Sequence, residues 1–124
     1  MKNLNIIYKK IPKAEKDLPV VIYQEQGYSI SDIIAEVEAG TTLGIILQEL
    51  PIMELSIELA KARLITQFSK HPELEFGAYG EKFISKQVWT AGELITEIEN
   101  ETEIGMQWIN SQLRRMEKIK ARWS

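Results

Sequence analysis

Hydrophobic and polar positions follow the same pattern in two stretches of the chain, residues 28–44 and 89–105, which align without a gap. In each stretch apolar residues recur at spacings of one and four positions, a pattern typical of one face of a helix. The pattern predicts a duplicated structural unit, with repeats over about residues 20–69 and 81–123. Five positions are identical in the two stretches: Ile34 and Ile95, Glu36 and Glu97, Glu38 and Glu99, Thr41 and Thr102, Gly44 and Gly105.

Both stretches begin with the signals of a helix N-terminus. Two residue pairs have the spacing of a capping box: Ser29 with Asp32, and Thr90 with Glu93. In this motif the first side chain accepts a hydrogen bond from the backbone N–H of the acidic residue, and the acidic side chain accepts one from the backbone N–H of the first residue. A large aromatic residue precedes each cap at the spacing of a hydrophobic staple. The expected staple pairs are Tyr28 with Ile33 and Trp89 with Leu94. Two short helices that start in the same way are therefore predicted.

Each short helix is expected to end in a tight corner, after which Thr41 or Thr102 caps a second helix. Gly44 and Gly105 fall in the first turn of those second helices, where glycine costs about 1 kcal/mol relative to alanine. A relaxed turn would tolerate them. We favour the other explanation, that each missing Cβ lets two packed helices approach closely.

Residues 4–8 and 19–23 are rich in β-branched and aromatic residues, so they are predicted to be paired strands. Residues 74–76 and 82–85 are predicted to form a second hairpin. A long helix is expected over residues 42–69, in which Pro51 either introduces a kink or starts a new helix. Its apolar part, residues 52–68, should be the centre of the core.

These elements predict a predominantly helical α+β fold. Residues 1–124 are expected to form a single domain of two related halves, each with a short β-hairpin, a short helix and a long helix. The last helix, from about residue 103 to 122, carries an apolar stripe to its end. The stripe consists of Ile109, Leu113, Met116, Ile119 and Trp123.

Charge is distributed unevenly along the 124 residues, although the net charge is only −3. Residues 1–17 carry five lysines against two acids, giving +3, and residues 109–124 carry five bases against one acid, giving +4. The middle, residues 18–108, carries five bases against fifteen acids, giving −10. Basic ends on an acidic body can pair with another copy or with an anionic partner.

Cysteine is absent, so a disulfide framework and a thiolate metal site are excluded. The amino terminus has no apolar signal core and no apolar run is long enough for a membrane span. We therefore expect a cytoplasmic protein with no membrane association.

Candidate catalytic residues are few, and we expect no enzymatic activity and no cofactor. His71 precedes Pro72 in a helix-breaking segment, where a solvated loop histidine is expected. The acidic pairs Glu36/Glu38 and Glu97/Glu99 are a weaker alternative, a carboxylate site for a hard cation or an enzyme that depends on it. Residues two apart on a helix point in different directions, so a solvated acidic face is the preferred interpretation.

The last helix carries the two leading functional hypotheses. The preferred one is a protein-interaction or assembly module that binds another protein or a second copy of itself through the distal apolar residues Leu113, Met116, Ile119 and Trp123. The alternative is a nucleic-acid-associated accessory protein. Its candidate phosphate contacts are Arg114, Arg115, Lys118, Lys120 and Arg122. The acidic body opposes approach to a polyanion, which favours the first hypothesis.

Overall fold

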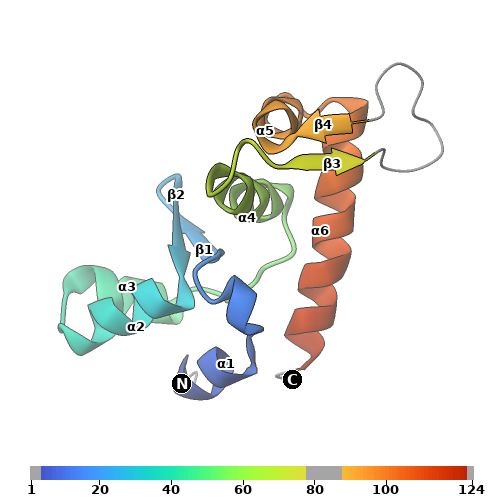
Figure 1. The fold of residues 1–124 in the computed structure, drawn as a ribbon. Coiled ribbons are helices and arrows are strands. Elements are labelled where there is room, and N and C mark those ends of the chain that lie inside the picture. Colours follow the sequence, from blue (N-terminus) through green and yellow to red (C-terminus); the bar gives the residue numbers. More distant parts are fainter. Residues whose placement is uncertain (1–3, 78–87, 123–124) are drawn as a thin grey trace.

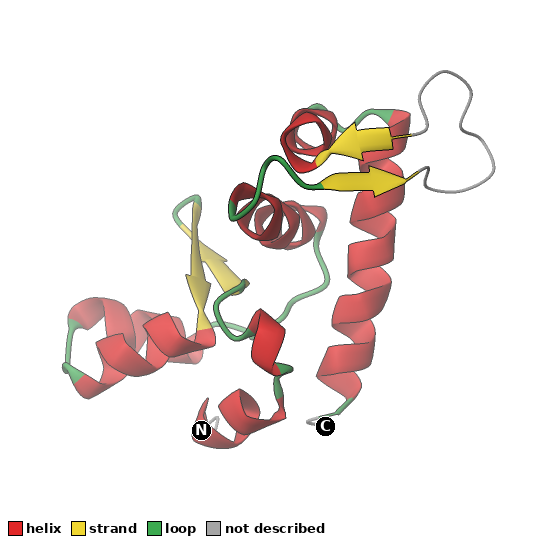
Figure 2. Ribbon diagram, viewed as in Figure 1, coloured by secondary structure: helices red, strands yellow, loops and turns green. Residues whose placement is uncertain are grey.

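The computed structural model describes residues 4–77 and 88–122. They form a predominantly helical α+β fold with two small antiparallel hairpins, as the sequence predicts (Figures 1 and 2). The elements are α1 (Leu4–Lys10), the 3-10 helix η1 (Lys13–Glu15), β1 (Pro19–Tyr23), β2 (Gln26–Ser29), α2 (Ile30–Glu38), α3 (Thr42–Glu49), α4 (Ile57–Ser69), β3 (Glu75–Gly77), β4 (Val88–Thr90), α5 (Ala91–Glu99) and α6 (Glu103–Ala121).

The amino-terminal segment is a helix, so the strand predicted for residues 4–8 is wrong. Leu4, Ile7, Tyr8 and Ile11 recur at the spacing of a helix face, and this segment packs on the core as α1 and the turn after it. The strand over residues 19–23 is confirmed as β1, but its antiparallel partner is β2, which follows directly along the chain. The β-branched composition of residues 4–8 was a weaker signal than the spacing of their apolar side chains.

The second hairpin pairs β3 with β4, and Phe76 lies opposite Trp89. The first predicted strand is confirmed in position, while the second, residues 82–85, lies outside the described residues. Both hairpins lead directly into a capped short helix: Ser29 lies opposite Pro19, and Thr90 opposite Glu75. The order of hairpin, short helix and further helix therefore occurs in both halves of the chain.

Both predicted capping boxes are present. Ser29 Oγ accepts from the Asp32 N–H at 3.1 Å, and Asp32 Oδ2 accepts from the Ser29 N–H at 3.0 Å. The corresponding distances at Thr90 and Glu93 are 3.1 and 3.0 Å. These bonds satisfy backbone N–H groups that have no partner within the helix.

Removal of either cap hydroxyl is expected to destabilise the protein by about 1 kcal/mol. We expect Ser29→Ala and Thr90→Ala to lower the free energy of unfolding by similar amounts, because the two boxes have the same geometry. The exposed neighbour Ser31 provides the control, since Ser31→Ala removes a hydroxyl from the same helix outside the box. Denaturant unfolding measures all three, and equal stability of Ser31→Ala and Ser29→Ala would contradict the capping role.

The two helical corners share their detailed geometry. Thr41 Oγ1 accepts from the Gly44 N–H at 2.9 Å, and Thr102 Oγ1 accepts from the Gly105 N–H at 3.1 Å. A Cβ on Gly44 would lie 2.5 Å from the Glu36 carbonyl oxygen, and one on Gly105 would lie 2.0 Å from that of Glu97. Close helix approach is therefore confirmed as the reason for both glycines.

Pro51 ends one helix and separates it from the next. Leu50 is extended, with φ −79° and ψ 149°, which is the conformation that a following proline favours. Residues 50–56 form a loop, and the Met53 N–H donates to the Val20 carbonyl oxygen at 2.8 Å, which fixes the loop to β1. The long helix predicted over residues 42–69 is consequently two helices, α3 and α4.

Helix α4 lies at the centre of the fold, as predicted for residues 52–68, and packs against β1, α5 and α6. In Figure 1 the pair α2 and α3 projects on one side of the molecule, and α6 runs along the other. None of the described helices is long and apolar enough to cross a membrane.

Candidate functional site

A buried arginine connects four segments of the chain beneath α6. Arg63, on α4, has no exposed surface. Its Nη2 donates to Glu15 Oε1 at 2.8 Å, its Nε to Gln112 Oε1 at 2.9 Å and its Nη1 to the Pro19 carbonyl oxygen at 2.9 Å. These bonds join α4 to η1, α6 and the start of β1, so each polar face of the buried guanidinium has a partner.

Glu15 also holds a second arginine at the surface. Arg115, on α6, donates from Nε to Glu15 Oε2 at 3.0 Å, and its Nη2 contacts the same oxygen. This hydrogen bond raises the pKa of Arg115, whereas burial lowers the pKa of Arg63 and the charge of Glu15 opposes that effect. The carboxylate is only 5% exposed and lies between two cations, so it secures η1 against α6.

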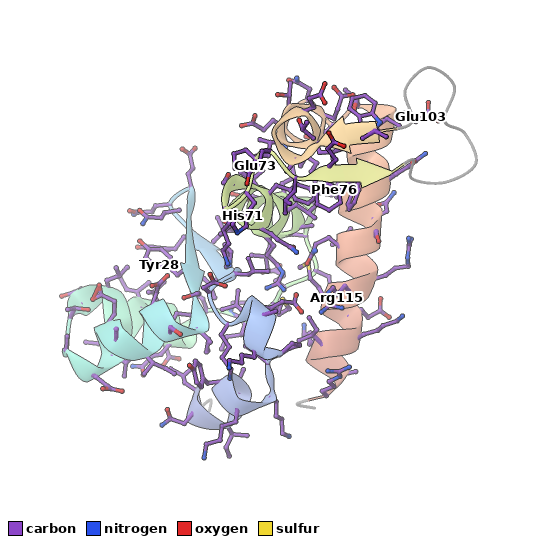
Figure 3. The ribbon with its side chains drawn as sticks, viewed as in Figure 1. Tyr28, His71, Glu73, Phe76, Glu103 and Arg115 are labelled. Carbon is purple, nitrogen blue, oxygen red and sulfur yellow. The ribbon has the colours of Figure 1, made fainter. Side chains whose placement is uncertain are left out.

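An aromatic pocket opens directly beside this ion pair. It has a volume of about 290 Å³, and its lining includes the aromatic residues Phe68, Phe76 and Trp108 and the polar residues Gln112 and Arg115. The three rings contact one another with centroids 5.2 to 5.7 Å apart in tilted and edge-to-face arrangements. Figure 3 shows Phe76 and Arg115 along the same side of α6. The pocket therefore combines an apolar wall with a charged one.

A basic pocket of about 280 Å³ continues from the aromatic one toward the end of α6. Ser111 and Arg115 line both pockets. The other cations that line the basic pocket are Arg114, Lys118 and Arg122. Within the described residues none of these three forms an ion pair. We call the two pockets together the α6 groove.

The structure brings together four of the five candidate phosphate contacts, because Arg114, Arg115, Lys118 and Arg122 all line the basic pocket. Lys120 lies on the same helix, is half-buried and does not line it. Arg115 differs from the other three because it forms an ion pair with Glu15, a carboxylate that it shares with Arg63. Among the described residues, the groove thus presents three uncompensated cations, which form no ion pair, and one paired cation.

The apolar candidates for partner binding are less accessible than the basic ones. Met116 is fully buried and Ile119 is 2% exposed, and both belong to the same core cluster as Ile11. Leu113 is half-buried against that core, and Trp123 lies outside the described residues. A partner could reach Met116 and Ile119 only if α6 separated from the core.

The acidic pairs Glu36/Glu38 and Glu97/Glu99 occur at the same place in both repeats, and one residue of each pair has a structural explanation. Glu36 accepts a hydrogen bond from the Thr41 hydroxyl at 2.9 Å, and Glu97 accepts one from Thr102 at 2.9 Å. Each carboxylate therefore stabilises the corner of its own repeat. Within residues 4–77 and 88–122 no group of three or more metal-binding side chains occurs.

His71 lies in the loop after α4 and is exposed, with Nδ1 3.5 Å from Glu73 Oε1 (Figure 3). The expectation of a solvated loop histidine is confirmed.

Sequence reasoning missed the buried network of Glu15, Arg63 and Gln112. One signal was present: Arg63 lies among apolar residues in a helix predicted to be central to the core. A charged side chain at such a position needs a partner, because burying an unpaired charge is very costly. Nothing in the sequence identified Glu15, within a lysine-rich segment, as that partner.

Comparison of the chain with protein-family models, curated proteins and solved structures finds no match. The geometry of the α6 groove is therefore the main guide to function.

Proposed function

We propose that this protein is a non-catalytic protein-interaction or assembly module that binds its partner through the α6 groove. The observation that carries the proposal is the junction of the aromatic and basic pockets at Ser111 and Arg115. Aromatic side chains and arginine are the residue types that contribute most to protein interfaces. We further propose a cytoplasmic location.

The side chains of the groove are suited to recognition rather than to a reaction. Ser111 is the hydroxyl that lines both pockets, and Glu15 is the carboxylate in the aromatic one. Two arginines already bind that carboxylate, one at each oxygen, so both of its oxygens are occupied by partners within the chain.

Nucleic acid is the second candidate partner, and the three uncompensated cations favour it. The arrangement of the aromatic rings is less suitable, because Phe68, Phe76 and Trp108 pack on one another in tilted and edge-to-face arrangements. A stacked base requires an open ring face. A protein partner with an acidic surface and an exposed apolar side chain can occupy both pockets without needing an open ring face.

Capture from an extract of the native host tests the proposal. The baits are the wild-type protein, the groove variant Arg114→Glu/Lys118→Glu and the control Glu99→Lys/Glu103→Lys. The control changes the net charge by the same amount in the opposite direction, and its changed residues are exposed near the second corner. We expect the wild type and the control to capture the same proteins at moderate salt and the groove variant to lose them. Identical capture by all three folded baits would contradict binding through the groove.

Oligonucleotide binding tests the second candidate with the same variants. Nucleic-acid binding predicts an affinity that falls with log salt at a slope of about −0.9 per phosphate contacted. Tight, salt-sensitive binding of single-stranded or duplex oligonucleotides that the folded groove variant loses would replace our proposal with the nucleic-acid function.

A further inference from the structure

We propose that the α6 groove of one copy receives the α2–α3 unit of a second copy, so that the chain assembles head to tail. This inference rests on the proposed function and assigns its partner. The argument uses the charge of the α2–α3 unit, its exposed apolar residues and its position relative to the groove.

The segment that contains α2 and α3 is acidic without interruption. Residues 18–60 include seven Asp and Glu residues and no Lys, Arg or His. Three of these acids, Asp32, Glu38 and Glu49, are exposed on the α2–α3 unit. The groove presents the opposite charge through Arg114, Lys118 and Arg122. Complementary charge of this kind steers association and fixes the orientation of the partners.

The α2–α3 unit also exposes apolar surface that its repeat counterpart covers. Ile45 is 59% exposed, while Met106, at the equivalent position of α6, is half-buried. Val37 is half-buried, while its equivalent Ile98 has no exposed surface. A unit that exposes both an apolar side chain and acidic ones matches a groove in which an aromatic pocket adjoins a basic one.

Helix α4 explains the difference between the two corners. It packs on both α5 and α6 and has no equivalent contact with α2 or α3 among the principal packed pairs. Lys61, on α4, also donates to the Glu99 carbonyl oxygen and to Glu101 Oε2, each at 3.2 Å. The second corner is therefore covered and partly neutralised by α4. Helix α1 contacts α2 in the first corner, but among the described residues Glu38 and Glu49 form no ion pair and Ile45 stays exposed.

Within one molecule α2 and α3 lie apart from α6, with α4 and the first hairpin between them (Figure 1). Contact between the two surfaces consequently requires a second copy. The interface is heterologous, since it joins two different surfaces, and it generates rings or open chains of copies.

Sedimentation equilibrium tests the assembly directly. We expect the wild type to self-associate at about 0.05 M salt and its association constant to fall about tenfold or more at about 0.5 M salt, where exposed charges are screened. We also expect each of two folded variants, Arg114→Glu/Lys118→Glu and Glu38→Lys/Glu49→Lys, to lose self-association. The control Glu99→Lys/Glu103→Lys changes the net charge by the same amount as Glu38→Lys/Glu49→Lys, and it is expected to associate like the wild type.

Mixing the two reversed variants provides the decisive outcome. The groove of Glu38→Lys/Glu49→Lys retains its cations, and the α2–α3 unit of Arg114→Glu/Lys118→Glu retains its acids. The mixture should therefore associate although neither variant does so alone, because like charges meet only between identical copies and each contact between the two variants joins opposite charges. Failure of the mixture to associate, or self-association of either variant, would overturn the head-to-tail interface.

The two proposals fail in different ways. A wild-type protein that stays monomeric at high concentration and low salt overturns the second-copy inference. If the wild-type bait nevertheless captures a protein that the groove variant loses, the groove binds a foreign partner and the proposed function stands. If oligonucleotides bind the groove instead, both proposals fail.

Discussion

Replacement of Arg63 with alanine is expected to lower the free energy of unfolding by about 3–5 kcal/mol, because it leaves a buried carboxylate without its principal partner. Glu15 is 5% exposed and would keep only Arg115, whose side chain is largely in solvent. Gln112 and the Pro19 carbonyl oxygen would lose a donor as well. A loss of this size is a large fraction of the stability typical of a small domain. Denaturant unfolding measures it.

Two further variants separate the buried network from a general effect of removing arginine. Arg114→Ala removes an exposed arginine from α6 that has no ion pair among the described residues, and we expect a change within about 0.5 kcal/mol. Arg63→Met combined with Glu15→Gln removes both buried charges, and it should be more stable than Arg63→Met alone. Equal losses for Arg63→Ala and Arg114→Ala would show that the network contributes little.

Replacement of Gly105 with alanine is expected to cost at least about 2 kcal/mol, because the new Cβ has no room. It would lie 2.0 Å from the Glu97 carbonyl oxygen and 2.6 Å from the carbon of that carbonyl, and both atoms belong to backbone that cannot rotate away. Gly44→Ala meets the same obstacle in the first corner, at 2.5 Å from the Glu36 carbonyl oxygen. Thermal or denaturant unfolding of both variants tests the prediction.

Gly92 is the matched control for these glycines, because it also lies in the first turn of a helix. A Cβ there would meet the Pro72 carbonyl oxygen at 3.5 Å, an ordinary contact. Gly92→Ala is therefore expected to be neutral or to stabilise the protein by up to about 1 kcal/mol through reduced freedom of the unfolded chain. Similar destabilisation at Gly92 and Gly105 would mean that close approach is not what the corner requires.

Local signals explain why much of the fold could be predicted. The capping boxes depend on residues three apart, so Ser29 with Asp32 was sufficient to place the start of α2. The corners could be predicted for a related reason. The repeat matched Thr41 with Thr102 and Gly44 with Gly105, and each set acts within about eight residues along the chain.

Longer-range packing explains what could not be predicted. Residues 4–8 have both β-branched composition and the spacing of a helix face, and only contact with the core decides between them. The partners of Arg63 lie 48 and 49 residues away at Glu15 and Gln112, and no local pattern connects such distant positions. The same applies to the α6 groove, whose basic residues were identified individually although its aromatic pocket was not.

Burial changes the interpretation of the last helix. Met116 and Ile119 were expected to face a partner, yet both are buried in the hydrophobic core of the same chain. What remains accessible on this part of α6 is mainly its basic side. The proposed interface therefore relies on charge beside an aromatic pocket and not on an apolar stripe.

The central claim is that the α6 groove and the α2–α3 unit are complementary surfaces. Nuclear magnetic resonance tests it most directly: isotope-labelled protein at low concentration is titrated with the unlabelled chain at low salt, and the backbone amide shifts are followed. We expect changes concentrated in residues 34–49 and 108–122, and their disappearance at high salt. Changes confined to other surfaces, or a spectrum that stays constant up to high concentration, would contradict the account.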